Sequence, residues 1–158
     1  MQQRLQPELP DISVQALEAP LRASILYRAA AVLLLLFAVG HTLGFRESDP
    51  SWGVDPVLRL MQSTHFTIQG FTRTYWDFFV GAGFTVGVLY LFAALLAWQL
   101  GSLPVETLAL MRVTAWGFAC CFAAVTVLSV VHLFWIPIVM SSLVTVCLSA
   151  AAWRSANR

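Results

Sequence analysis

The sequence predicts an all-α integral membrane protein, a bundle of four transmembrane helices. Hydrophobic residues make up 59% of the 158 residues and charged residues only 11%, against about 45–50% and about 25% in soluble proteins. A soluble domain of this size must keep a large surface in water, and this chain has too few charges to do so. Four apolar stretches each approach the roughly 20 residues that a helix needs to cross a bilayer.

The first transmembrane helix is predicted over residues 24–45, because residues 29–39 carry no charge. Residues 1–24 are polar and contain Pro7, Pro10 and Pro20, so we expect a cytoplasmic tail with at most a short amphipathic turn near residues 12–17. The apolar run starts near residue 25, later than the core of a secretory signal peptide. The helix is therefore expected to be retained, and the alternative is cleavage at residues 38–40.

The outer loop over residues 46–74 contains a predicted surface helix. Asp55 followed by Pro56 is typical of a helix start, and Gly70 after Gln69 is typical of a helix end. We expect one face of this helix to lie on the membrane surface or to cap the bundle. The residues of that face are Val57, Leu58, Met61, Thr64, His65 and Ile68.

Three further transmembrane helices are predicted over residues 75–100, 104–134 and 137–153, before a tail of residues 154–158. Pro104 suits the first turn of a helix, where its missing N–H would be unpaired in any case. The chain enters the hydrocarbon after Arg112. The connection between the last two helices is only Phe134-Trp135-Ile136, counted from the last residue of the first of them, which predicts a tight antiparallel helical hairpin. The transmembrane domain as a whole covers residues 25–153.

The distribution of arginine predicts how the chain is oriented. With four spans, both termini and the connection between the second and third helices lie on one side. That side carries Arg4, Arg22, Arg28, Arg112, Arg154 and Arg158. The opposite side carries Arg46, Arg59 and Arg73, balanced by Glu47, Asp49 and Asp55. Positive residues favour the cytoplasm, so we expect both termini there.

Several functional classes lack support in the sequence. The net charge of +1 gives no reason to expect nucleic acid as a partner, and without lysine there is no phosphate-binding loop of the Gly-Lys type. Cys120, Cys121 and Cys147 lie in apolar runs without a Cys-x-x-Cys spacing. Neither a metal site nor another cofactor is predicted. The cytoplasmic half of the predicted bundle has no polar residues that would continue a path across the membrane. A transporter would need polar or broken helices near the midplane, so this argues against one.

The predicted topology brings all three histidines to the outer side of the membrane, together with polar residues at the mouth of the second transmembrane helix. Ionisable groups at bilayer depth are costly to bury, which makes them candidates for function. We therefore predict a ligand-binding vestibule in the outer leaflet. Its candidate residues are His41, His65, Arg73, Tyr75, Asp77 and His132.

Each candidate also has a structural interpretation. Thr74 and Asp77 fit a capping box at the start of the second transmembrane helix. His41 could bond the backbone of a neighbouring helix, and His132 could reach the headgroup region. Arg73 could extend to a lipid phosphate or pair with Asp77.

Aromatic and glycine residues also have structural interpretations. An aromatic belt at the membrane surface accounts for Tyr75, Trp76, Trp52 and Trp135. Two GxxxG motifs predict close packing of the first two transmembrane helices, because absent side chains let backbones approach. A slot for a flat ligand is the alternative. The motifs are formed by Gly40 and Gly44, and by Gly83 and Gly87.

One pattern resembles a known family. It comprises His41-Thr42-Leu43-Gly44, Met61-Gln62-Ser63, Phe66, Gly70, the stretch Arg73-Thr74-Tyr75-Trp76-Asp77-Phe78-Phe79-Val80-Gly81, and Leu95-Leu96-Ala97-Trp98-Gln99-Leu100. Over roughly residues 25–153 the chain resembles a family of small four-helix bacterial inner-membrane proteins, and the Arg-x-Tyr-Trp-Asp-Phe stretch is the most specific part. The resemblance implies a location in the bacterial inner (cytoplasmic) membrane and brings no activity with it.

Three functional hypotheses follow. The preferred one is binding of a membrane lipid, a small hydrophobic ligand, a second copy or a partner membrane protein at the outer vestibule. The second is a membrane-embedded enzyme of isomerase or oxidoreductase type acting on an isoprenoid, sterol-like or quinone substrate, with His41, Asp77 and His132 as acid–base groups. The third is a b-type haem protein with His41 and His132 as axial ligands.

Overall fold

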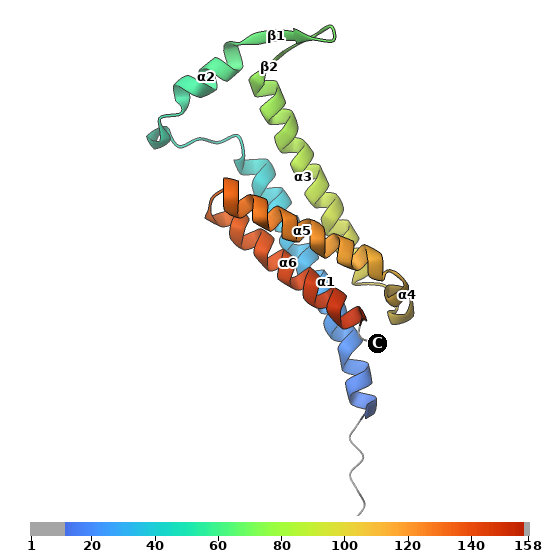
Figure 1. The fold of residues 1–158 in the computed structure, drawn as a ribbon. Coiled ribbons are helices and arrows are strands. Elements are labelled where there is room, and N and C mark those ends of the chain that lie inside the picture. The colour runs from blue at the N-terminus through green and yellow to red at the C-terminus, as the bar shows by residue number, and fades with distance from the viewer. Residues whose placement is uncertain (1–11, 157–158) are drawn as a thin grey trace, which may run out of the picture. The chain divides into compact units, whose positions relative to one another are not determined.

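The structure is a computed structural model that describes the backbone of residues 12–156 and the side chains of residues 23–155 other than residue 105. The regular elements among the described residues are helices and one short β-hairpin (Figure 1). The elements are α1 (Ile12–Gly44), the 3₁₀ turn η1 (Pro50–Trp52), α2 (Asp55–Ser63), β1 (His65–Ile68), β2 (Phe71–Thr74), α3 (Tyr75–Leu100), α4 (Val105–Leu110), α5 (Arg112–His132) and α6 (Trp135–Ala156).

The fold class predicted from the sequence is confirmed. In the described part of the chain, four helical segments are long and apolar enough to cross a membrane: Ala23–Gly44, Tyr75–Leu100, Arg112–His132 and Trp135–Ser155. A helix that is apolar on all sides needs a non-aqueous environment, because exposing its side chains to water is unfavourable. The protein is therefore a multi-pass, all-α membrane protein.

The chain forms two compact units, which we describe separately. The hairpin unit comprises Ala31–Leu96 and contains the second half of α1, α2, the β-hairpin and most of α3. The terminal unit comprises the chain up to Ala30 and from Ala97 onward, and it contains α4, α5 and α6.

A β-hairpin joins directly onto α3 in the hairpin unit. Its strands pair antiparallel, with His65 opposite Thr74 and Ile68 opposite Phe71. The turn residues Gln69 and Gly70 both have positive φ, 53° and 84°, as in the two-residue turns whose twist matches that of paired strands. β2 ends at Thr74 and α3 starts at the next residue. The hairpin and α2 run across the end of α3 (Figure 1).

The predicted surface helix was too long. Helix α2 starts at Asp55 as expected, but it ends at Ser63, and residues 65–74 form the hairpin instead. The physical reason lies in the residues around the turn, where aromatic and β-branched side chains alternate with a period of two. Gly70 therefore closes a turn between strands and does not end a helix.

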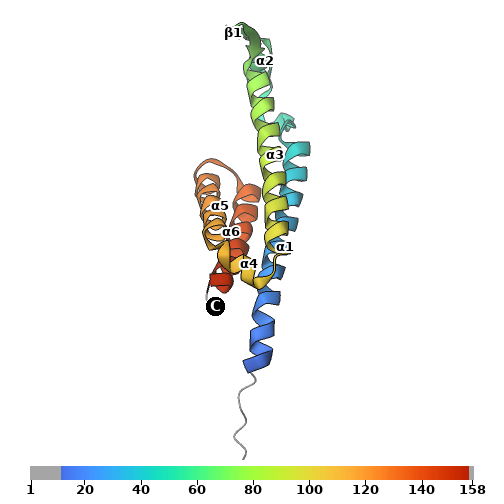
Figure 2. The same ribbon diagram turned by 90° about the vertical axis from the view of Figure 1, so that its right-hand side faces the viewer.

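The terminal unit is built around the pair α5 and α6, which pack side by side in both views (Figures 1 and 2). α5 ends at His132 and α6 begins at Trp135, so the predicted tight antiparallel hairpin is present. The hydroxyl groups of Thr126 and Thr145 bond across the pair at 2.9 Å. Near the start of α5 and the end of α6, the Trp116 and Trp153 rings pack edge to face.

Two predicted helix boundaries need correction. The membrane-spanning part of the first helix, Ala23–Gly44, agrees with the prediction, but α1 itself begins at Ile12, within the predicted tail. The segment before the apolar run is rich in helix formers, which outweigh Pro20. The predicted helix over residues 104–134 is interrupted at Met111, where φ is −89° and ψ is 21°. No glycine or proline marks that break. Residues 1–11 and 157–158 of the predicted tails lie outside the described residues.

In the terminal unit, α1 also lies in close contact with the end of α3 and the residue that follows it. The Ser24 hydroxyl donates a hydrogen bond to the Gly101 carbonyl, and a Cβ atom at Gly101 would lie 3.1 Å from the Cβ of Tyr27. Tyr27 is fully buried. The Arg28 guanidinium lies 5.5 Å from the centre of the Trp98 ring.

Candidate functional site

The β-hairpin has one apolar and one polar face. Paired residues share a face, and faces alternate along each strand. The register therefore places on the apolar face Phe66, Ile68, Phe71 and Arg73, and on the polar face His65, Thr67, Thr72 and Thr74. The hydroxyl groups of Thr67 and Thr72 bond at 3.2 Å, as two residues on the same face should.

The hairpin is fastened to α3 by a reciprocal cap. The Asp77 carboxylate accepts hydrogen bonds from the Thr74 backbone N–H at 2.8 Å and from its hydroxyl at 3.0 Å. The Asp77 N–H donates to the Thr74 hydroxyl at 3.1 Å. This is the capping box that the sequence predicts. Asp77 therefore holds the junction between strand and helix together.

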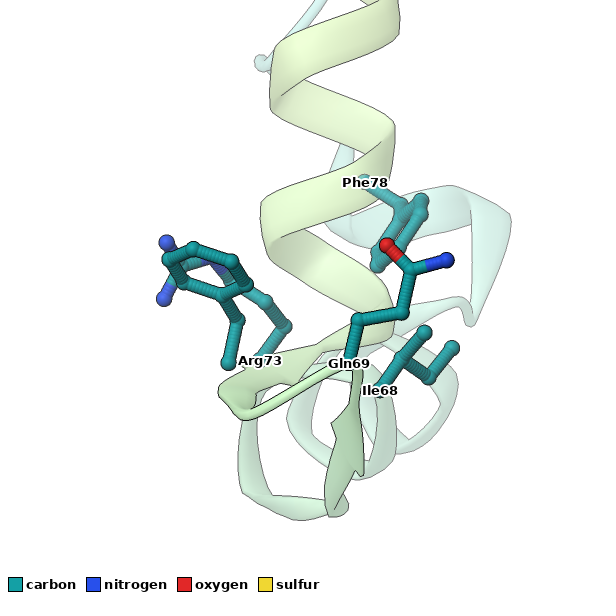
Figure 3. A pocket seen from close by; sticks show the side chains of 5 residues that line it. Ile68, Gln69, Arg73 and Phe78 are labelled. Carbon is teal, nitrogen blue, oxygen red and sulfur yellow. The ribbon is translucent and has the colours of Figure 1, made fainter.

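The apolar face of the hairpin is turned toward α3. The Phe66 ring lies 4.9 Å from that of Tyr75 and 5.6 Å from that of Phe78, centroid to centroid. Figure 3 shows Ile68, Gln69 and Arg73 extending from the hairpin to the side on which α3 and Phe78 lie.

A hollow of about 330 Å³ lies between this face and the first turn of α3, lined by Ile68, Gln69, Phe71, Arg73 and Phe78 (Figure 3). The Arg73 guanidinium donates a hydrogen bond to the Thr72 carbonyl at 2.8 Å and lies 5.4 Å from the centre of the Phe71 ring. Of these lining residues, only Arg73 is among the candidate site residues predicted from the sequence. Alternation around Gln69-Gly70 was the signal that could have identified the others.

His65 faces away from the hollow. It is exposed on the polar face, and its Nδ1 donates to the Ser63 carbonyl at 2.9 Å. His65 and Arg73 are close in the fold, but they belong to opposite faces of the hairpin. The hollow therefore combines one cation with apolar surface and does not include a histidine.

His41 bonds to a helix backbone, which is its predicted structural role. Its Nε2 lies 3.1 Å from the carbonyl oxygen of Gly83. Because a carbonyl only accepts, Nε2 carries the proton. The ring stacks between Phe37 and Phe45, at 5.9 and 5.2 Å. In this arrangement Nε2 of His41 is not free to act as a base or to ligate iron.

Only the second glycine pair takes part in the contact between α1 and α3. A Cβ atom at Gly83 would lie 2.2 Å from the Phe45 ring, and one at Gly87 would lie 2.6 Å from the Thr42 hydroxyl. At Gly40 and Gly44 no described atom lies within 4 Å of such a Cβ. Glycines of α3 thus accommodate side chains of α1, and there is no open slot for a flat ligand at Gly83.

The remaining predicted residues do not form one cluster in the hairpin unit. Arg73, Tyr75 and Asp77 lie together at the junction of hairpin and α3, and the exposed Tyr75 ring packs on Phe66. His132 belongs to the terminal unit, where it is the exposed last residue of α5. Among the described residues, no three His, Cys, Asp or Glu side chains are placed to hold a metal ion.

Two further charged groups, Arg46 and Asp49, lie in the loop that follows α1. Arg46 lies 5.6 Å from the centre of the Phe45 ring and 5.2 Å from that of Phe84, so its charge is held against aromatic surface. Hydrogen bonds from the Ser51 side chain and backbone N–H keep the pKa of Asp49 below its ordinary value. The loop thus carries both signs of charge.

Wider comparison assigns no family to the chain. No family model, no curated protein and no solved structure matches it. Function is therefore inferred from the geometry of the chain itself, and the hollow beneath the hairpin is the place where a cation and apolar surface meet.

Proposed function

We propose that this membrane protein binds an anionic membrane lipid in the hollow beneath its β-hairpin, with the headgroup at Arg73 and an acyl chain along Phe78. The observation that carries the proposal is the lining of the hollow. Arg73 and the Gln69 amide supply hydrogen-bond donors, and Ile68, Phe71 and Phe78 supply apolar surface. A polar group and a hydrocarbon chain on one molecule match both parts.

The level of the hollow relative to the membrane supports a lipid as the ligand. The apolar segment of α3 begins at Tyr75, and Phe78 lies in its first turn. Headgroups and hydrocarbon meet at that level, and aromatic residues such as Tyr75 and Trp76 are typical of it. Phe78 and Phe79 are 54% and 41% exposed, so a chain leaving the hollow continues along an apolar helix.

The charge supports an anionic headgroup. A guanidinium has five N–H donors in a planar fork and binds phosphate oxygens in pairs, and the Thr72 carbonyl accepts from only one nitrogen of Arg73. Asp77 lies one turn away, and its carboxylate accepts from Thr74. With the termini in the cytoplasm, the hollow lies in the outer leaflet of the bacterial inner membrane.

The test is native mass spectrometry of the protein with an equal mixture of phosphatidylglycerol and phosphatidylcholine. We expect phosphatidylglycerol to be retained in preference. Arg73→Gln should weaken its retention about fivefold, because a basic residue at a lipid surface contributes about 1 kcal/mol. Arg59→Gln is the matched control, since Arg59 is exposed in α2 and does not line the hollow.

Two outcomes count against the proposal. Equal retention by the Arg73→Gln variant would show that the guanidinium does not hold the headgroup. Displacement of the lipid by equimolar glycerol phosphate would show that phosphate is recognised without the acyl chain, which contradicts the role given to Phe78.

A further inference from the structure

We infer that the β-hairpin lies flat on the membrane surface, with its apolar face in the lipid and its polar face in water. The hairpin would then anchor the end of α3 at the interface. The occupant of the apolar face is the bilayer, of which a lipid in the hollow would be one molecule. This inference does not depend on lipid selectivity at Arg73.

The exposure of the hairpin supports this placement. On the apolar face Ile68 is 52% exposed and Phe71 is 62% exposed, whereas the polar face presents threonine hydroxyl groups and His65. A two-stranded hairpin is marginally stable in water unless its apolar face is covered. Lipid covers this face without a further protein segment.

The contact with α3 decides which way the apolar face points. Phe66 belongs to the apolar face and packs 5.6 Å from Phe78. Phe78 is part of a helix that spans the membrane from Tyr75 onward. The face that contains Phe66 therefore looks along α3 into the membrane, and the polar face looks into water.

The junction keeps the hairpin in that orientation. Thr74 ends β2 and Tyr75 begins α3, so no linker allows the hairpin to swing. The hydrogen bonds between Thr74 and Asp77 hold the first turn. Because the hairpin runs across the end of α3 (Figure 1), it lies along the surface when α3 crosses the bilayer. Transmembrane helices tilt on average about 20°, which preserves this arrangement.

The experiment measures the exposure of single spin labels in lipid nanodiscs. Cys120, Cys121 and Cys147 are first replaced by alanine, and nitroxides are then attached to Ile68→Cys and Phe71→Cys on the apolar face. Thr67→Cys and Thr72→Cys are matched controls, since each is the direct neighbour of a test position. Val88→Cys, 64% exposed on α3, supplies the reference value for lipid.

We expect the labels at positions 68 and 71 to collide often with oxygen and rarely with a water-soluble nickel chelate, as at position 88. Labels at 67 and 72 should show the opposite preference. High nickel accessibility at all four hairpin positions, or no difference between the two faces, overturns the inference. Circular dichroism of each labelled protein confirms that the helices are intact, so that only folded variants are compared.

The same labels separate this inference from the lipid site. Introducing Arg73→Gln should leave the difference between positions 71 and 72 unchanged, even where phosphatidylglycerol retention falls. A flat hairpin without lipid preference removes only the proposed function. A lipid preference with a hairpin exposed to water on both faces removes only the inference made here.

Discussion

The ring of Phe66 lies 5.6 Å from the ring of Phe78, and this pair connects the β-hairpin to the first turn of α3. Aromatic pairs at such separations contribute about 0.5–1.5 kcal/mol beyond the burial of their surface. Phe66→Ala should therefore loosen the hairpin and speed amide hydrogen exchange over residues 65–74. Phe71→Ala removes a ring from the same face that lies against Arg73, and it should speed exchange less. Equal exchange in both variants would contradict the anchoring role of Phe66.

The capping box predicts a non-additive effect. Thr74→Val and Asp77→Ala each remove side-chain bonds of the capping box and should each destabilise the start of α3 by about 1 kcal/mol. The double variant should cost little more than either single one, because the bonds depend on each other. Hydrogen exchange at the amides of Trp76 and Asp77 measures the effect. Additive losses would show that the two residues act separately.

Gly83 and Gly81 offer a matched pair on one helix. A Cβ at Gly83 would lie 2.2 Å from the Phe45 ring, whereas at Gly81 nothing lies within 4 Å. Gly83→Ala should destabilise the protein by about 1–3 kcal/mol, as overpacking does. Gly81→Ala should be neutral or stabilising by up to about 1 kcal/mol, since alanine favours a helix. Unfolding in mixed micelles with increasing dodecyl sulfate ranks the variants, and equal midpoints would rule out close packing at Gly83.

The bond between His41 and Gly83 predicts a single tautomer. Nitrogen NMR of labelled His41 should show a protonated Nε2 and an unprotonated Nδ1 in the neutral ring. His41→Phe keeps the stacking with Phe37 and Phe45 but loses the hydrogen bond. We expect it to cost about 0.6 kcal/mol, the average for such bonds between membrane helices. A ring protonated at Nδ1 would show that the bond is absent in the membrane.

The transmembrane helices were predictable because their signal extends over many residues. Long uncharged segments have few alternatives to crossing a bilayer, and the two residues between α5 and α6 leave only an antiparallel pair. The hairpin was missed because residues 55–68 also fit one face of a helix. Gly70 is typical of a helix end, but here it belongs to the turn that follows β1. The break at Met111 carries no local signal at all.

The candidate site was predictable only where its residues are neighbours in sequence. Thr74 and Asp77 lie three residues apart at a helix start, so their contact follows from local geometry. The contact of His41 with Gly83 depends on how two apolar helices are rotated about their axes. Hydropathy does not determine that rotation, since lipid-facing and buried surfaces are equally apolar. The predicted position of His132 on the same side of the membrane as the other histidines stays a prediction.

Photo-cross-linking with an anionic phospholipid tests the lipid-binding hollow most directly. A phosphatidylglycerol with a diazirine near the headgroup end of one chain is activated in nanodiscs, and modified peptides are identified by mass spectrometry. We expect cross-links to concentrate between residues 66 and 79 and to fall about fivefold in Arg73→Gln. Cross-links spread evenly along the lipid-facing sides of all four transmembrane helices, and unchanged by that substitution, would contradict this account.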